Sequence, residues 1–225
     1  MANTEPSWLM YAASFSRVLP PITLLARRAA TPGRSWAAVA CLVLIVGDYA
    51  ARTLGSRGVN NLWIGYISNP VVGIATLLAL ASWQRSLRSQ RIFLVLAPVF
   101  ALAWITMVLA AEDVSKFSVA AFPLQALLLL ILSLWTLLTN GLTDGTGALT
   151  RSDWFWVSVG FALSNGAASA IEPLSAMLLS SAPERLFQLF NFRAGIDLLA
   201  ALAITAGMLC PVTTAPSSPS SSPAH

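Results

Sequence analysis

Six long apolar stretches constrain this chain more than any other feature of its sequence. A helix rises 1.5 Å per residue and the hydrocarbon core of a bilayer is about 30 Å thick, so a spanning helix needs roughly 20 mostly apolar residues. Long runs rich in leucine and alanine also favour helices over strands. The sequence therefore predicts an all-α, polytopic transmembrane helix bundle with spans at residues 36–54, 62–83, 92–111, 117–139, 154–180 and 186–209.

A seventh, weaker apolar stretch at residues 8–26 decides the number of spans. Arg17 lies at its middle, and Pro20 and Pro21 interrupt it. We expect seven spans if this segment crosses the bilayer and six if it does not. Residues 1–210 would form a single transmembrane domain, and the Pro- and Ser-rich residues 211–225 a disordered cytoplasmic tail.

The composition agrees with a membrane protein and excludes nucleic acid as a partner. Only 10% of the 225 residues are charged and 56% are apolar, whereas about a quarter of the residues of a soluble domain carry charge. The net charge of +4 comes largely from arginines in the short loops at residues 27–34 and 85–91. These arginines form no continuous patch with interleaved aromatic residues, so the expected partner is the lipid bilayer.

The same loops predict the orientation, because lysine and arginine are enriched in cytoplasmic loops. Both arginine-rich loops lie on one side of the membrane in either scheme, and we expect that side to be cytoplasmic. The C-terminus would then be cytoplasmic, and the N-terminus would lie outside if the chain has seven spans. The expected location is a bacterial inner membrane.

Charged residues within the spans are the candidate functional groups, because ionisable side chains are costly in a bilayer and usually face the bundle interior. Their formal charges, three positive and three negative, sum to zero, which predicts a self-neutralising polar interior. They are Arg17, Asp48, Glu172, Arg193 and Asp197, with Arg52 near the end of a span.

The last two spans predict the strongest cluster. Glu172 lies about ten residues before the turn that joins them and Arg193 about ten residues after it, so both should lie roughly 15 Å from the membrane boundary. Asp197 is four residues beyond Arg193, on the same helix face. We expect Glu172 and Arg193 to pair, with Asp197 as a second carboxylate. Asp48 and Arg52 have the favourable i,i+4 order and should form a structural ion pair.

Two asparagines extend this candidate binding site. Asn165 lies in the small-residue run 164–170 that precedes Glu172 and Pro173, and Asn69 precedes Pro70. A proline inside a helix frees a backbone carbonyl, and small residues let neighbouring helices approach closely. The candidate set for binding a small molecule or an ion is Glu172, Arg193, Asp197, Asn165 and Asn69.

The remaining residues predict no cofactor, no metal site and no catalytic residue. The one histidine, His225, lies at the terminus, and two cysteines, Cys41 and Cys210, cannot hold an iron–sulfur cluster. The single lysine, Lys116, lies in a predicted loop, which excludes a retinal Schiff base in the last span.

Three functions stay open at this point. The polar interior could bind a small molecule or an ion for transport or sensing, with Glu172 as the protonatable group. The same charges could simply pack the helices of a structural or accessory subunit. The carboxylates Asp48, Glu172 and Asp197 could also serve a lipid-modifying membrane enzyme. A mid-bilayer cavity that reaches Glu172 favours binding or catalysis, whereas a dry, closed seam favours packing alone.

Short motifs resemble two families. Pro20 in the first span, Asp48 late in the second, the sequence at 61–63 and the aromatic entry at 153–156 resemble small bacterial seven-helix membrane proteins. This resemblance implies seven spans and brings no activity with it. Residues 19–49 also resemble the first helix of lysoplasmalogenase-like proteins, but the further acidic and histidine positions expected of that family are missing here.

Overall fold

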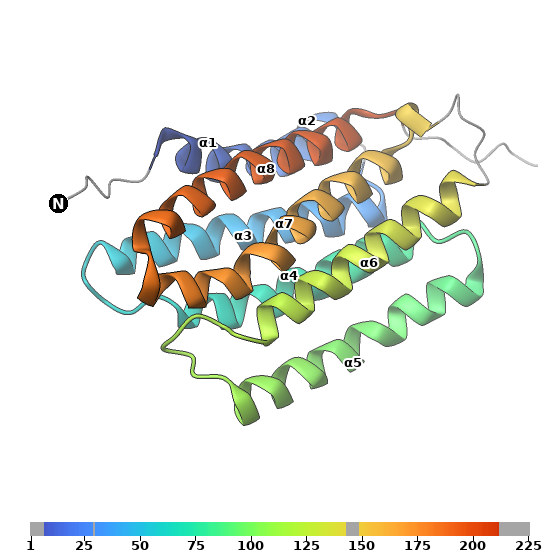
Figure 1. Cartoon of the computed structure of the whole chain (residues 1–225). Coiled ribbons are helices and arrows are strands. Elements are labelled where there is room, and N and C mark those ends of the chain that lie inside the picture. The colour runs from blue at the N-terminus through green and yellow to red at the C-terminus, as the bar shows by residue number, and fades with distance from the viewer. Residues whose placement is uncertain (1–6, 29, 143–148, 212–225) are drawn as a thin grey trace, which may run out of the picture.

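The computed structural model describes residues 7–28, 30–142 and 149–211, and the regular structure in these ranges is helical. The chain folds as a helical bundle, which confirms the predicted all-α class (Figure 1). The predicted tail at 211–225 lies outside the described residues except for Pro211. The elements are α1 (Trp8–Ser16), α2 (Leu19–Arg27), α3 (Pro32–Gly55), α4 (Trp63–Ser82), α5 (Leu87–Ala111), α6 (Ala121–Gly141), the short 3-10 helix η1 (Leu149–Arg151), α7 (Asp153–Ser181) and α8 (Pro183–Leu209).

The long helices run side by side, and α1 with α2 forms the first of seven rods (Figure 1). Six segments in the described part of the chain are long and apolar enough to cross a membrane, and the weak first stretch, Trp8–Arg27, is one of them. α7 is not among the six, because small and polar residues interrupt its apolar ones. Its 29 residues nevertheless exceed the length of a span, and it packs between α6 and α8. All seven rods therefore have the length and the setting of membrane-crossing helices.

Large apolar side chains cover the outer surface of the bundle. Leu102 on α5, Ile131 on α6 and Leu199 on α8 are each more than half exposed. A soluble monomer rarely exposes so continuous an apolar surface, whereas the acyl chains of a bilayer cover it. The outer surface thus supports the membrane assignment independently of the hydropathy of each helix.

The contact between α7 and α8 depends on a glycine. These helices form an antiparallel pair joined at Ala182. A Cβ atom on Gly160 would lie 2.7 Å from the carbonyl oxygen of Ala200 and 2.5 Å from the Ile204 side chain, which is closer than real contacts allow. The bare backbone of Gly160 therefore lets α7 lie directly on α8, and this close approach positions the charged residues farther along both helices.

Pro70 lies within α4 without ending it, although its nitrogen cannot donate to the carbonyl one turn earlier. That carbonyl belongs to Tyr66, and the indole Nε1 of Trp104 on α5 donates to it at 3.2 Å. The Trp104 ring also stacks on Phe122 of α6, with 5.6 Å between ring centroids. The carbonyl that Pro70 leaves without a backbone donor thus links α4 to Trp104 of α5, and the Trp104 ring extends this contact to α6.

Arg34 closes the arginine-rich end of the bundle. The sequence prediction assigned it to a loop, but α3 begins at Pro32, and the Arg34 side chain is fully buried. Its Nε donates to Asp153 Oδ2 at 2.9 Å, and its Nη2 donates to the Cys210 carbonyl at 2.9 Å. One guanidinium therefore joins the first turns of α3 and α7 to the end of α8.

Glu112 organises the opposite end, where its carboxylate caps α6. The backbone amides of Ala120 and Ala121 donate to Oε1 at 2.9 and 2.8 Å, and the Ser118 hydroxyl donates to the same atom at 2.9 Å. Partial burial raises the pKa of the Glu112 carboxyl. These donors together lower it by a larger amount, so that its pKa lies below the ordinary value. The cap is needed because Ala120, the residue before the helix, has no side chain that can accept these bonds.

Candidate functional site

Glu172 on α7 and Arg193 on α8 form the predicted ion pair in the interior of the bundle. Both side chains are largely buried, and Arg193 Nη1 donates to Glu172 Oε1. Arg193 Nε also lies 3.6 Å from Asp197 Oδ2, one helical turn farther along α8. The guanidinium therefore lies between two carboxylates, as the spacing of these residues predicted.

Arg17 joins this cluster from the first rod. Its Nη1 donates to Asp48 Oδ2 of α3 at 2.5 Å, and its Nη2 donates to Asp197 Oδ2 of α8 at 2.9 Å. Arg17 follows the last residue of α1, at the point where the rod is interrupted before α2. The interruption has a local cause, since Pro20 and Pro21 cannot donate to the carbonyls of Ser16 and Arg17 one turn earlier.

Asp48 and Arg52 do not pair directly. Asp48 accepts from Arg17 instead, and Arg52 Nη2 donates to the Ser14 hydroxyl at 2.6 Å. The Ser14 hydroxyl in turn donates to Asp48 Oδ2 at 3.2 Å. The two residues are thus linked through Ser14 of α1, because a cation from another rod lies nearer to Asp48 than the arginine on its own helix.

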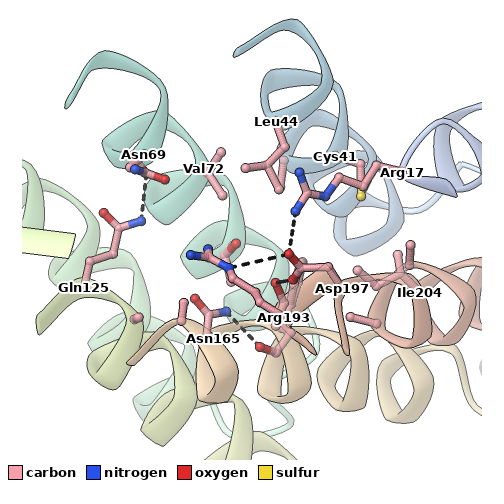
Figure 2. A pocket seen from close by; sticks show the side chains of 18 of the residues that line it. Arg17, Cys41, Leu44, Asn69, Val72, Gln125, Asn165, Arg193, Asp197 and Ile204 are labelled. Atoms are coloured by element: carbon pink, nitrogen blue, oxygen red, sulfur yellow. Dashed lines mark hydrogen bonds and ion pairs between the residues drawn. The ribbon is translucent and has the colours of Figure 1, made fainter. Parts of the chain in front are cut away.

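A cavity of about 90 Å³ lies at the centre of this network, between α3, α4, α6, α7 and α8 (Figure 2). A single water needs only about 10–15 Å³ of such volume, so several waters or a small solute fit, whereas drug-sized ligands need roughly 300 Å³ or more. All five residues of the predicted binding set line it: Asn69, Asn165, Glu172, Arg193 and Asp197.

Three neutral polar side chains of the cavity donate separate hydrogen bonds to groups around it. Ser164 Oγ donates to Asp197 Oδ1 at 2.8 Å, and Asn165 Nδ2 donates to the Phe161 carbonyl at 2.8 Å. Gln125 Nε2 donates to the Asn69 carbonyl at 2.9 Å (Figure 2). Among the described residues, however, Gln125 Oε1 is one of two buried side-chain atoms without a hydrogen-bond partner. This oxygen is buried beside the cavity, on its α6 side, and is not open to it.

The charges around the cavity cancel. Arg17 and Arg193 supply two positive charges, and Glu172 and Asp197 supply two negative ones. Each of these carboxylates is already bound by a guanidinium. Among the described residues no three aspartate, glutamate, cysteine or histidine side chains come together as metal ligands. The wall is thus suited to a solute without net charge.

A wider vestibule of about 270 Å³ lies beside the cavity, between α1, α3 and α8. Arg17, Arg193 and Asp197 line both spaces, so that their side chains form the wall between them. The vestibule also contains Ser14 and Arg52, which lie toward the end of the bundle where α1 begins. Disruption of the ion pair between Arg17 and Asp197 would remove part of that wall.

Three residues that line the cavity were not part of the binding set predicted from the sequence. Arg17 was identified as an intramembrane charge, but its partners depend on the rotation of three separate helices. Ser164 was noted only as part of a small-residue run. Gln125 had a usable signal, because it is the only amide side chain within the apolar stretch 121–138.

No protein-family model matches this chain, and no curated protein or solved structure is significantly similar to it. The resemblance to small bacterial seven-helix membrane proteins therefore stays a prediction. What the cavity does must be inferred from its own residues.

Proposed function

We propose that this membrane protein binds a small polar solute of no net charge in the central cavity and carries it across the bilayer. The observation that carries this proposal is the convergence of the five predicted polar residues, from α4, α7 and α8, on one cavity. Helix packing alone requires ion pairs and small residues, but it requires no open space beside them.

The free acceptor of Gln125 supports an occupant over a purely structural network. A buried polar atom without a partner costs about 1–3 kcal/mol. Gln125 is 8% exposed, and its Oε1 accepts no hydrogen bond from the described residues. Gln125 lines the cavity, so a turn of its amide toward the cavity would let a solute with an N–H or O–H group satisfy this oxygen and recover that cost. The favoured class is therefore a neutral or zwitterionic solute with at least one donor.

The interrupted first rod supports transport. Many transporters bind substrate near the bilayer midplane beside discontinuous helices, whose ends can move without breaking a continuous helix. Here the break between α1 and α2 falls at Arg17, a residue of the cavity wall. Arg34 closes the arginine-rich end of the bundle, so that the vestibule is the nearer route to the cavity. We assign the arginine-rich end, and with it Pro211, to the cytoplasmic side of the membrane.

Ligand-dependent unfolding tests the proposal. A solute that binds only the folded state stabilises it by about 2.7 kcal/mol at a hundred times its dissociation constant. The probes are glycine and alanine as net-neutral donors, with sodium, potassium, chloride and acetate as ions. We expect at least one net-neutral probe to raise the unfolding temperature of the purified protein, and proteoliposomes to accumulate that probe.

Two variants make the test specific to the cavity. The Glu172→Gln, Arg193→Gln double variant removes the internal ion pair and should lose the response. The Asp113→Asn, Lys116→Gln double variant removes an ion pair in the loop before α6 and should keep it. If only the ions raised the unfolding temperature, the result would contradict the proposal that the cavity binds a solute of no net charge. No response to any probe, together with an internal double variant as stable as the wild type, would favour a purely structural network.

A further inference from the structure

A long groove runs between α1 and α3 on the lipid-facing surface of the bundle. Its volume is about 780 Å³, and its walls are mostly apolar, with Phe15 and Val18 on the first rod and Ile45 on α3. The groove exists because α1 packs mainly on α8 and touches α3 only slightly (Figure 1). In a membrane, this groove is open to the acyl chains of the surrounding lipid.

Arg52 provides a positive charge at one end of this groove. Its side chain is exposed, and its guanidinium carbon lies 5.0 Å from the centre of the Tyr11 ring. Within the described part of the chain Arg52 has no carboxylate partner, because Asp48 pairs with Arg17. Its hydrogen bonds go to the neutral Ser14 hydroxyl and the Met10 carbonyl. The charge of Arg52 is therefore available to an anion in the groove.

The polarity of the groove changes with depth. Arg52 lies three residues before the end of α3, or about 4.5 Å along the helix axis, which is the level of lipid headgroups. Ile45 lies seven residues earlier, about 10 Å deeper. The groove is thus cationic at the headgroup level and apolar around Ile45, and the Asp48 carboxylate, which lines the groove between these levels, is neutralised by Arg17. This order matches an amphiphile with an anionic head.

We propose that the groove between α1 and α3 binds one phospholipid of the adjacent leaflet, with its phosphate on Arg52 and an acyl chain along Phe15, Val18 and Ile45. The guanidinium can donate to two phosphate oxygens at once. A helix from a second copy of this chain would fill the apolar part but would leave the charge of Arg52 unmatched. This lipid site shares Ser14, Asp48 and Arg52 with the vestibule but no residue with the central cavity, and it does not depend on the solute that the cavity takes.

Native mass spectrometry of the delipidated full-length chain tests the site, with palmitoyl-oleoyl phosphatidylglycerol as the probe. We expect one tightly bound lipid on the wild type. Arg52→Gln should weaken this binding about tenfold, Arg52→Lys should restore much of it, and Ile45→Trp should weaken it by filling the groove. Arg57→Gln is the matched control, because it removes an exposed arginine just beyond α3.

Three results would overturn the proposal. Equal lipid binding by the wild type, Arg52→Gln and Ile45→Trp would exclude this groove as the site. Displacement of the lipid by millimolar inorganic phosphate would indicate a general anion site. A dimer that Ile45→Trp dissociates would show that a second copy occupies the groove. If Arg52→Gln fails to fold, the comparison of Ile45→Trp with Arg57→Gln decides the outcome.

Discussion

Arg17 Nη2 lies 2.9 Å from Asp197 Oδ2, so that an arginine at the break of the first rod meets a carboxylate on the last helix. The same guanidinium binds Asp48 of α3. The first two rods and the last helix of the bundle therefore share one ionic contact beside the cavity. This contact both closes the cavity wall and connects it to the most interrupted rod of the bundle.

Replacement of Arg17 by glutamine should destabilise the protein by about 3 kcal/mol, because it leaves Asp48 and Asp197 without their shared cation. Thermal unfolding in detergent measures the effect. Adding Asp48→Asn and Asp197→Asn to Arg17→Gln should recover much of the loss, since uncharged residues no longer need that cation. Arg88→Gln, which removes an exposed arginine near the start of α5, is the control. Equal unfolding temperatures for Arg17→Gln and Arg88→Gln would show that the contact contributes no stability.

Replacement of Arg34 by lysine should be nearly as damaging as replacement by alanine. The guanidinium binds Asp153 and the Cys210 carbonyl in two directions while fully buried, and a lysine ammonium cannot reproduce that planar geometry. We expect a loss of about 3 kcal/mol for either change. The free energy of unfolding in denaturant measures it. Wild-type stability of the Arg34→Lys variant would mean that the charge alone suffices.

Gly160→Ala should force α7 away from α8, because its new methyl group would lie 2.7 Å from the Ala200 carbonyl oxygen. Overpacking of this kind costs about 1–3 kcal/mol. Gly141→Ala is the matched control, since nothing lies within 4 Å of a Cβ at that position. The unfolding temperatures of the two variants should therefore differ. A Gly160→Ala variant as stable as the wild type would show that the two helices separate easily.

The stabilisation that Glu112 provides should disappear in acid. Its carboxyl pKa is lowered from 4.5 in the folded protein, so the contribution is complete above pH 4.5 and is lost as the pH falls through the lower folded value. Glu112→Gln should cost about 1 kcal/mol at neutral pH, the usual value of a helix cap. The difference in unfolding temperature between wild type and variant should shrink progressively as the pH falls below 4.5. A constant difference at every pH would exclude ionisation of Glu112 as the cause.

The sequence predicted the fold and the pairing of Glu172 with Arg193, because both depend on distances along the helix axis. The number of residues between each side chain and the turn at Ala182 gives its depth along the helix axis. Glu172 and Arg193 have nearly equal depths, and this equality predicted the pair. The partner of Asp48 could not be predicted in this way. It depends on how α3 is rotated toward Arg17, and the i,i+4 rule compares residues of one helix only.

The burial of Arg34 was missed for a related reason. An excess of arginine in a loop indicates which side of the membrane the loop faces, but not whether a particular side chain is exposed. Gln125 likewise reaches the cavity because α6 turns that face toward α4 and α7. Such rotations follow from packing between helices, and no residue spacing within a single helix encodes them.

The position of Arg34 has a consequence for biosynthesis. Asp153 and Cys210, its partners, lie 119 and 176 residues later in the chain. While the ribosome is still making the later helices, Arg34 must stay hydrated at the membrane surface. Only after α8 has been released can α3 settle to its final depth. Closure of this end of the bundle therefore waits for α8, and a chain truncated before α8 would keep Asp153 but leave Arg34 without the Cys210 carbonyl.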